Sequence, residues 1–271
     1  MAKTPTKNRT DPSASSPTDP VEAYARSVGA GETVAGPLVR LACERHLRDL
    51  RDGPKRGLFW DWPAASRAIE FFAEVLRLNG GEHEGRPFVL RPWQAFIVGS
   101  LFGWKLGSGG PRRFRVAFAE IGKGNGKSPL AAGIGIYLMC ADNEPRAEVY
   151  AAAVTRDQAG ILFRDAVAMV DQSPLLDARI TRSGTAGREW NLADLKTGSF
   201  FRPISSDTTG KGKSGYRPHG VLLDELHEHP TSAMVEFMRA GTKGRKQALV
   251  LMITNSGWDR TSVCWDRHEY G

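Results

Sequence analysis

The chain has 271 residues, of which 41% are hydrophobic and 25% charged, as expected for a globular protein with a sizeable core. No apolar run reaches the roughly 18 residues of a membrane span, residues 1–20 lack the apolar centre of a secretory signal, and the three widely spaced cysteines match neither a disulfide framework nor a zinc site. The formal charge of +7 favours a polyanionic partner but is too small to establish one.

The first 110 residues have the pattern of a helical region behind a polar tail. Residues 1–20 are rich in Pro, Ser, Thr and Lys, have little to bury, and are expected to be disordered. From residue 21 onward, apolar residues recur at helical spacing between Pro, Asn and Gly boundaries. This pattern predicts helices over residues 21–28, 36–53, 64–81 and 91–104.

After residue 110, short apolar runs alternate with helical segments. The runs predict strands over residues 114–121, 147–154, 220–225 and 248–255, and the periodic segments predict helices over 128–140, 155–172 and 231–242. Strands that are apolar throughout and alternate with helices indicate a mostly parallel sheet that is covered on both faces. The polar, glycine-rich stretch 183–217 is expected to hold a hairpin and a mobile loop.

A glycine-rich turn, GKGNGKS, joins the first of these strands to a helix. It fits the phosphate-loop (Walker A) pattern G-x-x-x-x-G-K-[ST], except that Ile121 stands in place of the first glycine. In such a loop, backbone N–H groups cradle the phosphates, Lys127 would reach the β- and γ-phosphates of ATP, and Ser128 would bind Mg²⁺. An ordinary glycine-rich connection is the alternative. The nucleotide-binding candidates in the turn are Gly122, Gly124, Asn125, Gly126, Lys127 and Ser128.

Two acids, Asp224 and Glu225, end the apolar run VLLDE at the carboxyl end of a predicted strand. Ligands of parallel sheets bind at that edge. As a Walker B pair, Asp224 would hold Mg²⁺ and Glu225 would accept a proton from the attacking water as general base. A solvated acidic turn explains the acids taken alone, but their combination with a GKS loop in a matching strand context favours a nucleotide site.

Two further stretches have a functional and a structural interpretation. In RPWQ, Trp93 could stack on adenine and the amide of Gln94 could pair with its edge, but Trp93 alone is more simply explained as a core residue. In ITNSG, which ends the last predicted strand, polar side chains could lie near the γ-phosphate and sense its loss. Asn, Ser and Gly are also ordinary strand-ending residues.

Two other patterns carry weaker hypotheses. His227 and His229 in HEH could bind a metal, but no third ligand is evident. The basic segment KGKSGYR, residues 211–217, could contact a nucleic-acid backbone with Tyr216 stacking on a base, or could be a solvated loop.

With these motifs in this order, the chain resembles the large terminase subunit of tailed bacteriophages, the ATP-driven motor that packages DNA into a preformed capsid. The stretches LRPWQAFIVGSLFGW, RRFRVAFAEIGKGNGKSPLAAGI and LLDELH carry the likeness, which spans about residues 35 to 265. It implies an α/β, RecA-like (ASCE) P-loop ATPase that uses ATP and Mg²⁺. A mostly parallel central sheet flanked by helices would follow an N-terminal helical segment. The expected division is a tail over 1–20, a helical region with the adenine-binding segment over 21–110, and the ATPase core over 111–271.

The resemblance also implies roles for single residues. It assigns Trp93 and Gln94 to adenine, Asp224 to magnesium, Glu225 to water activation, and Thr254 with Asn255 to the coupling of hydrolysis to movement. Lys123 stands where this family more usually has an arginine, which is a candidate for stabilising negative charge in the transition state. Lys123 and Lys127 are therefore both candidate catalytic residues. An arginine from a neighbouring subunit would complete the site, with Arg239 and Arg245 as candidate donors.

The implied partners are double-stranded DNA, a portal protein and a small terminase subunit. A homo-oligomeric ring is expected on the procapsid, and the isolated protein is allowed to be a monomer. The expected location is the host cytoplasm and, transiently, the portal vertex of the procapsid. No membrane partner is expected. The RNase H-like nuclease domain of the family is expected to be absent from this chain. The alternatives are a superfamily 2 helicase-like DNA-dependent ATPase, because DELH fits a D-E-x-H box, a DNA-binding adaptor with a vestigial nucleotide site, or a metal hydrolase built on HEH.

Overall fold

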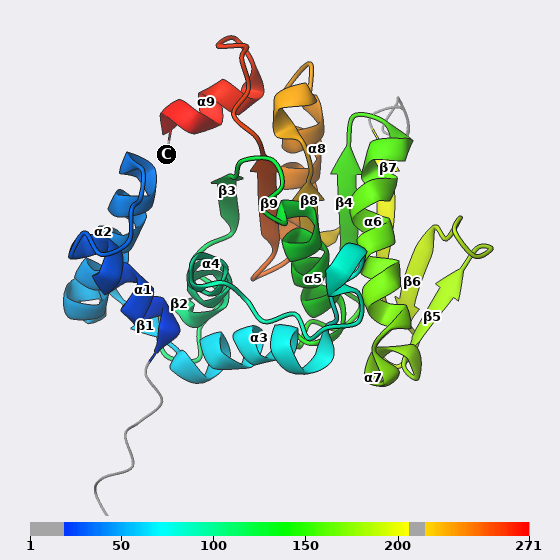
Figure 1. Cartoon of the computed structure of the whole chain (residues 1–271), viewed down its shortest axis with the longest axis horizontal. Coiled ribbons are helices and arrows are strands. Elements are labelled where there is room, and N and C mark those ends of the chain that lie inside the picture. The colour runs from blue at the N-terminus through cyan, green and yellow to red at the C-terminus, as the bar shows by residue number, and fades with distance from the viewer. Residues whose placement is uncertain (1–18, 206–214, 271) are drawn as a thin grey trace, which may run out of the picture.

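The computed structural model describes residues 19–205 and 215–270. Its centre is a sheet whose strand order in the described residues is β3-β9-β8-β4-β7-β6-β5 (Figure 1). The first five strands in this order run parallel, and β6 and β5 continue the sheet antiparallel. The predicted α/β class with a mostly parallel sheet is confirmed. The strands are β3 (Val116–Glu120), β4 (Glu148–Ala153), β5 (Ile180–Ser183), β6 (Asn191–Asp194), β7 (Ser199–Ser205), β8 (Pro218–Leu223) and β9 (Leu249–Thr254).

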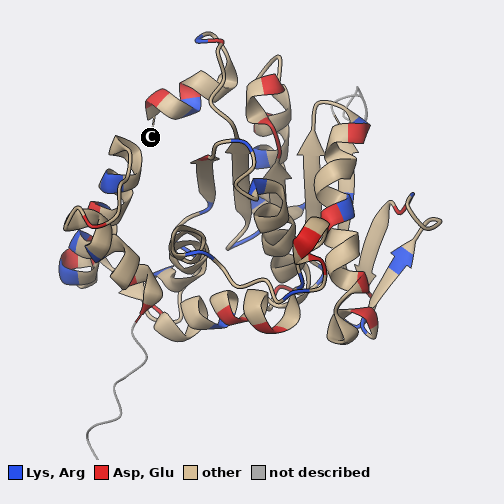
Figure 2. Ribbon diagram, in the orientation of Figure 1, with Lys and Arg blue, Asp and Glu red and all other residues tan. Residues whose placement is uncertain are grey.

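Helices cover both faces of this sheet, which explains why the central strands are apolar throughout (Figure 1). Along β8, Leu222 faces one buried cluster while Val221 and Leu223 face another. The first cluster is closed by α5 (Lys127–Cys140) and α6 (Arg156–Asp171), and the second by α8 (Ala233–Gly241) and α9 (Val263–Tyr270). Strands β8 and β9 carry no Lys, Arg, Asp or Glu, and charged residues gather on helices and loops (Figure 2).

The residues before the sheet form a helical region that shares its core. The helices are α1 (Pro20–Gly29), α2 (Pro37–Asp52), α3 (Trp62–Val75) and α4 (Pro92–Gly103), with the short β1 (Leu58–Trp60) and β2 (Trp104–Leu106) pairing beside them. Phe72 of α3 and Phe102 of α4 are fully buried in the same cluster as α5. The described residues also contain shorter elements: η1 (Gly53–Arg56), η2 (Gly81–His83), α7 (Pro174–Asp177), η4 (Leu226–Glu228) and η5 (Thr242–Gly244). Within the described ranges, no helix is both long and apolar enough to cross a membrane.

The stretch 183–217 differs most from expectation. The antiparallel pair that lies inside this stretch is β6 with β7, whereas β5 ends where the stretch begins. Strand β7 is also a parallel strand inside the main sheet, next to β4. Its sequence SFFRPIS mixes apolar residues with Ser, Arg and Pro, and Phe201 is fully buried. That ring packs so closely on α5 that a Cβ at Gly135 would lie 2.7 Å from it. Helix α3 ends at Val75, before the expected Gly81, because Leu76 turns into extended backbone. The segments α7 and α9 and the β1–β2 pair were not predicted.

Two expectations fall wholly or partly outside the described residues. The tail over 1–20 is described only from Asp19, whose carboxylate caps α1 by accepting from Val21 N at 2.8 Å. The basic segment 211–217 is described only from Gly215. Tyr216 packs edge-on against Tyr150 and Phe237, with ring centroids 5.1 and 5.8 Å away. The ring is therefore part of the fold, and base stacking by Tyr216 is not supported.

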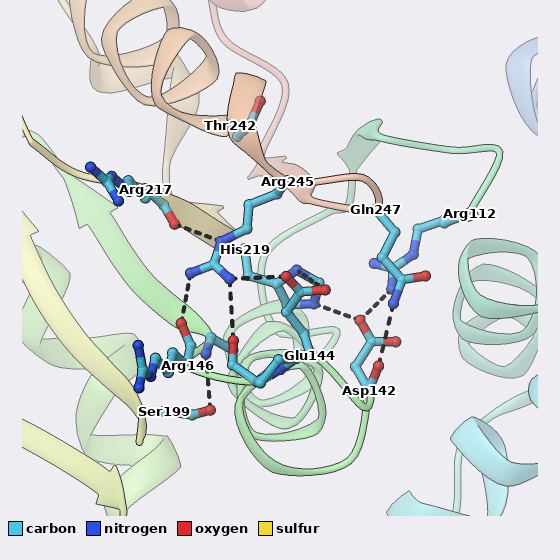
Figure 3. A network of polar contacts seen from close by, with 12 residues as sticks. Arg112, Asp142, Glu144, Arg146, Ser199, Arg217, His219, Thr242, Arg245 and Gln247 are labelled. Carbon is cyan, nitrogen blue, oxygen red and sulfur yellow. Dashed lines mark hydrogen bonds and ion pairs between the residues drawn. The ribbon is translucent and has the colours of Figure 1, made fainter. Parts of the chain in front are cut away.

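A polar network closes the edge of the sheet where the parallel strands begin (Figure 3). Asp142, just after α5, accepts a hydrogen bond at 2.6 Å from Arg112, and its carboxylate lies 2.6 Å from Nε2 of His219. The Arg112 and His219 side chains are fully buried. Arg245 donates to the Glu144 carboxylate at 2.9 Å and to backbone carbonyls at Arg146 and Arg217. We call this set of residues, Arg112, Asp142, Glu144, His219 and Arg245, the amino-edge network.

Candidate functional site

The glycine-rich turn sits at the opposite edge of the sheet, between β3 and α5 (Figure 1). Gly124 and Gly126 have φ of 83° and 71°, which side chains with a Cβ rarely adopt. The Asn125 amide closes the turn by donating to the Gly122 carbonyl at 3.0 Å. Helix α5 then starts at Lys127, and its first backbone N–H groups have no partner within the helix. The turn therefore presents a helix N-terminus with the geometry that binds phosphates.

Lys127 meets Glu225 across this edge. Its Nζ lies 2.8 Å from Glu225 Oε1, and the two side chains are 10% and 26% exposed. Glu225 has φ of 47°, an uncommon backbone conformation for a residue other than glycine that costs of order 1–3 kcal/mol. Its second oxygen, Oε2, is buried and accepts no hydrogen bond from the described residues. Strain and an unsatisfied carboxylate oxygen are typical of a working site.

Asp224 lies at the end of β8 and is 5% exposed. Its Oδ1 accepts a hydrogen bond from Glu225 N at 2.9 Å. Burial, followed by the neighbouring Glu225 charge, raises the pKa of Asp224 to about 6. A bound cation would reverse this shift, because it favours the ionised carboxylate.

The predicted adenine segment comes to the same place. Gln94 is buried, and a Cβ added at Gly126 would lie 3.8 Å from its Nε2, so its side chain lies against the turn. The side-chain oxygen of Gln94, Oε1, accepts from Arg91 N at 2.8 Å and caps α4. Trp93 is half-buried and packs on the main core, so it contributes to the core in addition to any contact with a nucleotide.

Strand β9 lies between β3 and β8, and its last residues complete the site. Thr254 is fully buried, and its carbonyl accepts from Ile121 N at 2.9 Å, directly before the turn. The Asn255 side-chain oxygen is buried without a hydrogen-bond partner among the described residues. The structure thus brings the turn, the two acids and the strand-ending polar residues to one edge.

Two residues of this edge, His227 and Glu120, were assigned differently or were not predicted from the sequence. His227 contacts both Thr254 and Glu225, and the described residues contain no cluster that could hold a metal, so HEH has no metal-site geometry. Glu120 ends β3 and binds His268 of α9 at 2.8 Å as well as Ser256. Burial opposes ionisation of Glu120, but the hydrogen bonds from Ser256 and His268 outweigh it and lower its pKa. Position at strand ends was the available signal for Glu120.

The basic residues considered as transition-state stabilisers differ in whether their side chains already have partners. Lys123 and Arg239 are exposed, and neither side chain has a hydrogen-bond or ion-pair partner within the described ranges. Arg245 is instead fixed in the amino-edge network, at the other edge of the sheet (Figure 3).

The family model "Terminase large subunit, ATPase domain" matches residues 92–271. The large terminase subunit of Enterobacteria phage HK97 is 25% identical over 193 residues, which are 69% of this chain and 36% of that protein. Protein YmfN of Escherichia coli (strain K12) is 38% identical over 53 residues, 20% of this chain and 12% of that protein.

The crystal structure of the HK97 bacteriophage large terminase matches this fold with a TM-score of 0.63 and 21% identity, covering 76% of this chain and 40% of that chain. The chain spans about two-fifths of the length of the HK97 protein. The likeness agrees with the α/β fold class and its mostly parallel sheet, and the family expected from the sequence motifs is confirmed. Because the family model covers more than half of its residues, the chain belongs to the terminase large subunit family, in its ATPase domain.

Proposed function

We propose that this chain is the motor domain of a phage terminase large subunit and couples ATP hydrolysis to translocation of double-stranded viral DNA into a procapsid. The observation that carries the proposal is the Lys127–Glu225 contact, which joins a phosphate-binding turn to a candidate general base. Family membership supports nucleotide binding and ATP hydrolysis. The superfamily 2 helicase alternative is not favoured, because the matches are to terminases.

The residues present fit ATP. The positive-φ glycines let phosphate oxygens approach the backbone, and the N-terminus of α5 offers N–H donors at Lys127 and Ser128. Gln94 lies against the turn and could read the adenine edge, with Trp93 beside it on α4. Lys127 would leave Glu225 for the phosphates, because a phosphate carries more negative charge than one carboxylate.

The residues also fit Mg²⁺. Ser128 and Asp224 would hold the ion, and both are oxygen ligands of the kind Mg²⁺ prefers. When bound, Mg²⁺ would neutralise negative charge on the phosphate oxygens. The almost buried Asp224 carboxylate supports this assignment, because burial without a cation opposes its ionisation.

Glu225 is the proposed general base. Once Lys127 is drawn to the phosphates, the Glu225 carboxylate is released to orient water and accept its proton. Lys127, and Lys123 from its exposed position on the turn, would stabilise the charge that develops on the transferred phosphoryl group. Of the two arginines considered as donors from a neighbouring subunit, Arg239 is the better candidate, since Arg245 already has four partners in its own chain.

Thr254 and Asn255 would couple loss of the γ-phosphate to movement. They stand at the end of β9, which lies in the sheet between β3, the strand before the glycine-rich turn, and β8, the strand before Asp224 and Glu225. The proposed partners are double-stranded DNA, a portal protein, a small terminase subunit and further copies of this chain in a ring at the portal vertex, in the host cytoplasm. We retain the division into a helical region over 21–110 and an ATPase core over 111–271 as part of the proposal.

The test replaces Glu225 by Gln, which keeps the shape and removes the base. Turnover of ATP should fall by about 100- to 10,000-fold while the Kd for ATP changes little. Glu228→Gln is the matched control, an acid three residues away that should keep basal turnover. Addition of double-stranded DNA should stimulate hydrolysis by the wild type. Full activity in Glu225→Gln would remove this residue from its role, and an absence of ATP binding by the wild type would favour the vestigial-site alternative.

A further inference from the structure

His227 lies at the centre of three contacts that the proposed mechanism does not use. It follows Glu225 by two residues, in η4. Its backbone N–H donates to Thr254 Oγ1 at 3.1 Å, and its ring Nδ1 lies 2.9 Å from the same hydroxyl. The same Nδ1 is 3.4 Å from Glu225 Oε2. One ring nitrogen therefore faces both the candidate base and the end of β9.

The hydrogen positions around Nδ1 follow from the partners. The Thr254 hydroxyl has two other acceptors for its hydrogen, the Asn255 carbonyl at 2.9 Å and Cys264 Sγ at 3.7 Å, and with its hydrogen on either of them its oxygen accepts from His227. An ionised Glu225 carboxylate also only accepts. Nδ1 must then carry hydrogen for either contact to be attractive. The geometry favours the Nδ1–H tautomer, with Thr254 as its main acceptor and Glu225 Oε2 within reach.

Packing restricts the His227 side chain near its Cβ. The His227 side chain is 20% exposed, and a Cβ added at Gly257 would lie 3.1 Å from His227 Cβ, so the chain after β9 closes over it. Nε2 lies 3.9 Å from Glu228 Oε1 instead, and His227 and Glu228 both line a pocket of about 240 Å³. Only Nδ1 is directed at the site.

We propose that His227 is a positioning residue that holds Glu225 in place for catalysis and ties it to Thr254. The inference rests on the proposed function, in which Glu225 is the base. Lys127 holds Oε1 of the carboxylate before nucleotide binds. When Lys127 turns to the phosphates, the Nδ1–H of His227 is the remaining side-chain donor near this carboxylate in the described part of the chain. His227 then keeps Glu225 aimed at water and links its position to the end of β9.

The experiment distinguishes a role of Nδ1 from a role of Nε2 of His227. In His227→Asn the side-chain amide reaches the place of Nδ1, whereas in His227→Gln it reaches the place of Nε2, and His227→Ala removes both. We expect kcat for ATP to fall about 10- to 100-fold in the Ala and Gln variants, as for other residues that orient a reacting group, with KM within about threefold of wild type. His227→Asn should stay within about threefold of wild type in both constants. Thermal unfolding of each variant shows that it is folded.

Thr254→Val gives a second, independent measurement, since it removes the hydroxyl that orients the ring and keeps the shape. It should lower kcat as His227→Ala does, and the double variant should be no worse than either one, because both break the same link. Additive losses would mean that the two residues act separately and would overturn the proposed link.

Failure of this inference is distinguishable from failure of the proposed function. If the wild type hydrolyses ATP, Glu225→Gln does not, and folded His227→Ala keeps its kcat, only the positioning role is overturned. The same holds if His227→Asn is as impaired as His227→Ala, or if KM rises with kcat unchanged. If Glu225→Gln is as active as the wild type, or the wild type binds no ATP, the proposed function fails and the role of His227 fails with it.

Discussion

The two edges of the central sheet both hold charged side chains, and they differ in how these side chains are paired and in backbone strain. At the amino edge, Asp142 accepts from buried Arg112 and His219, while Arg245 joins separate segments through carbonyls and Glu144 (Figure 3). At the carboxyl edge, Lys127 is buried and Glu225 is partly exposed, Glu225 is strained, and its Oε2 has no hydrogen-bond partner among the described residues. Buried atoms without a hydrogen-bond partner among the described residues occur at both edges, on Arg112 and His219 as well as on Glu225. Charges held by several partners at the amino edge, and a strained candidate base beside Lys127 at the carboxyl edge, indicate a structural and a functional cluster.

The two buried aspartates show the same difference in their pKa. Asp142 resists ionisation because it is buried, but Arg112 and His219 outweigh this effect and lower its pKa. Burial and the neighbouring Glu225 charge raise the pKa of Asp224 to about 6. An identical Asp-to-Asn change should therefore have opposite effects on stability at the two edges. Four predictions test this contrast.

The largest expected effect is on stability at the amino edge. Asp142→Asn leaves the Arg112 charge buried without a counter-charge, and should lower the free energy of unfolding by about 3–5 kcal/mol in urea titrations. Asp177→Asn is the control, because that residue is paired to Arg182 but is 59% exposed, and it should cost less than about 1 kcal/mol. Equal losses in the two variants would show that the amino-edge network is not a stabilising cluster.

The second effect is on activity at the carboxyl edge. Lys127→Met removes the charge and keeps most of the apolar stem, so kcat for ATP should fall about 100- to 1,000-fold. The free energy of unfolding should change by less than about 1 kcal/mol, since the lost partner Glu225 is partly solvated. Lys246→Met, an exposed lysine near the amino edge, should keep basal turnover. A large loss of stability without loss of activity would reverse the assignment of the two edges.

The third effect is a gain in stability from Asp224→Asn, opposite in sign to the loss expected from Asp142→Asn. Asp224→Asn removes a buried charge that lacks a cation, and should raise the free energy of unfolding by about 1–3 kcal/mol at pH 8 without Mg²⁺, since one pKa unit corresponds to about 1.4 kcal/mol. The same variant should lose ATP turnover. Destabilisation of this variant under those conditions would contradict the pKa of about 6.

The smallest effect is the pH dependence of that gain. Because the folded-state pKa of Asp224 lies above the unfolded value, folded wild type binds more protons between about pH 4 and 6, and this group costs stability as pH rises through that window. The advantage of Asp224→Asn should therefore shrink toward zero as pH falls from 8 to about 4. Asp142, whose pKa is lowered, loses its stabilisation only as the pH falls below its unfolded value of 3.8. An advantage that stays constant from pH 8 to 4 would rule out this origin.

Sequence patterns located the elements whose signal is local. Strands β3, β4, β8 and β9 are apolar runs and were predicted within about two residues, as were the long helices of the sheet region. Strand β7 was missed, because its burial depends on Phe201 meeting the gap at Gly135, a contact between segments far apart in the chain. The β1–β2 pair depends in the same way on pairing across α3 and α4.

In the candidate site too, residues in local motifs were predicted from the sequence, whereas contacts between distant segments were not. The glycine turn, Lys127 and the acids Asp224 and Glu225 follow from motif spacing and strand ends. The contacts of His227 with Thr254 and of Glu120 with His268 join separate strands and helices, so no spacing rule reveals them. The place of Arg245 at the amino edge likewise depends on how the chain returns from α8 to β9.

The most direct test of the central claim is a crystal structure of the chain with Mg²⁺ and a non-hydrolysable ATP analogue. The account predicts phosphates against residues 122–128, adenine beside Trp93 and Gln94, and Lys127 Nζ moved from its 2.8 Å contact with Glu225 onto a phosphate oxygen. His227 should still face the released carboxylate. A nucleotide bound elsewhere, with the Lys127–Glu225 contact intact, would contradict the account.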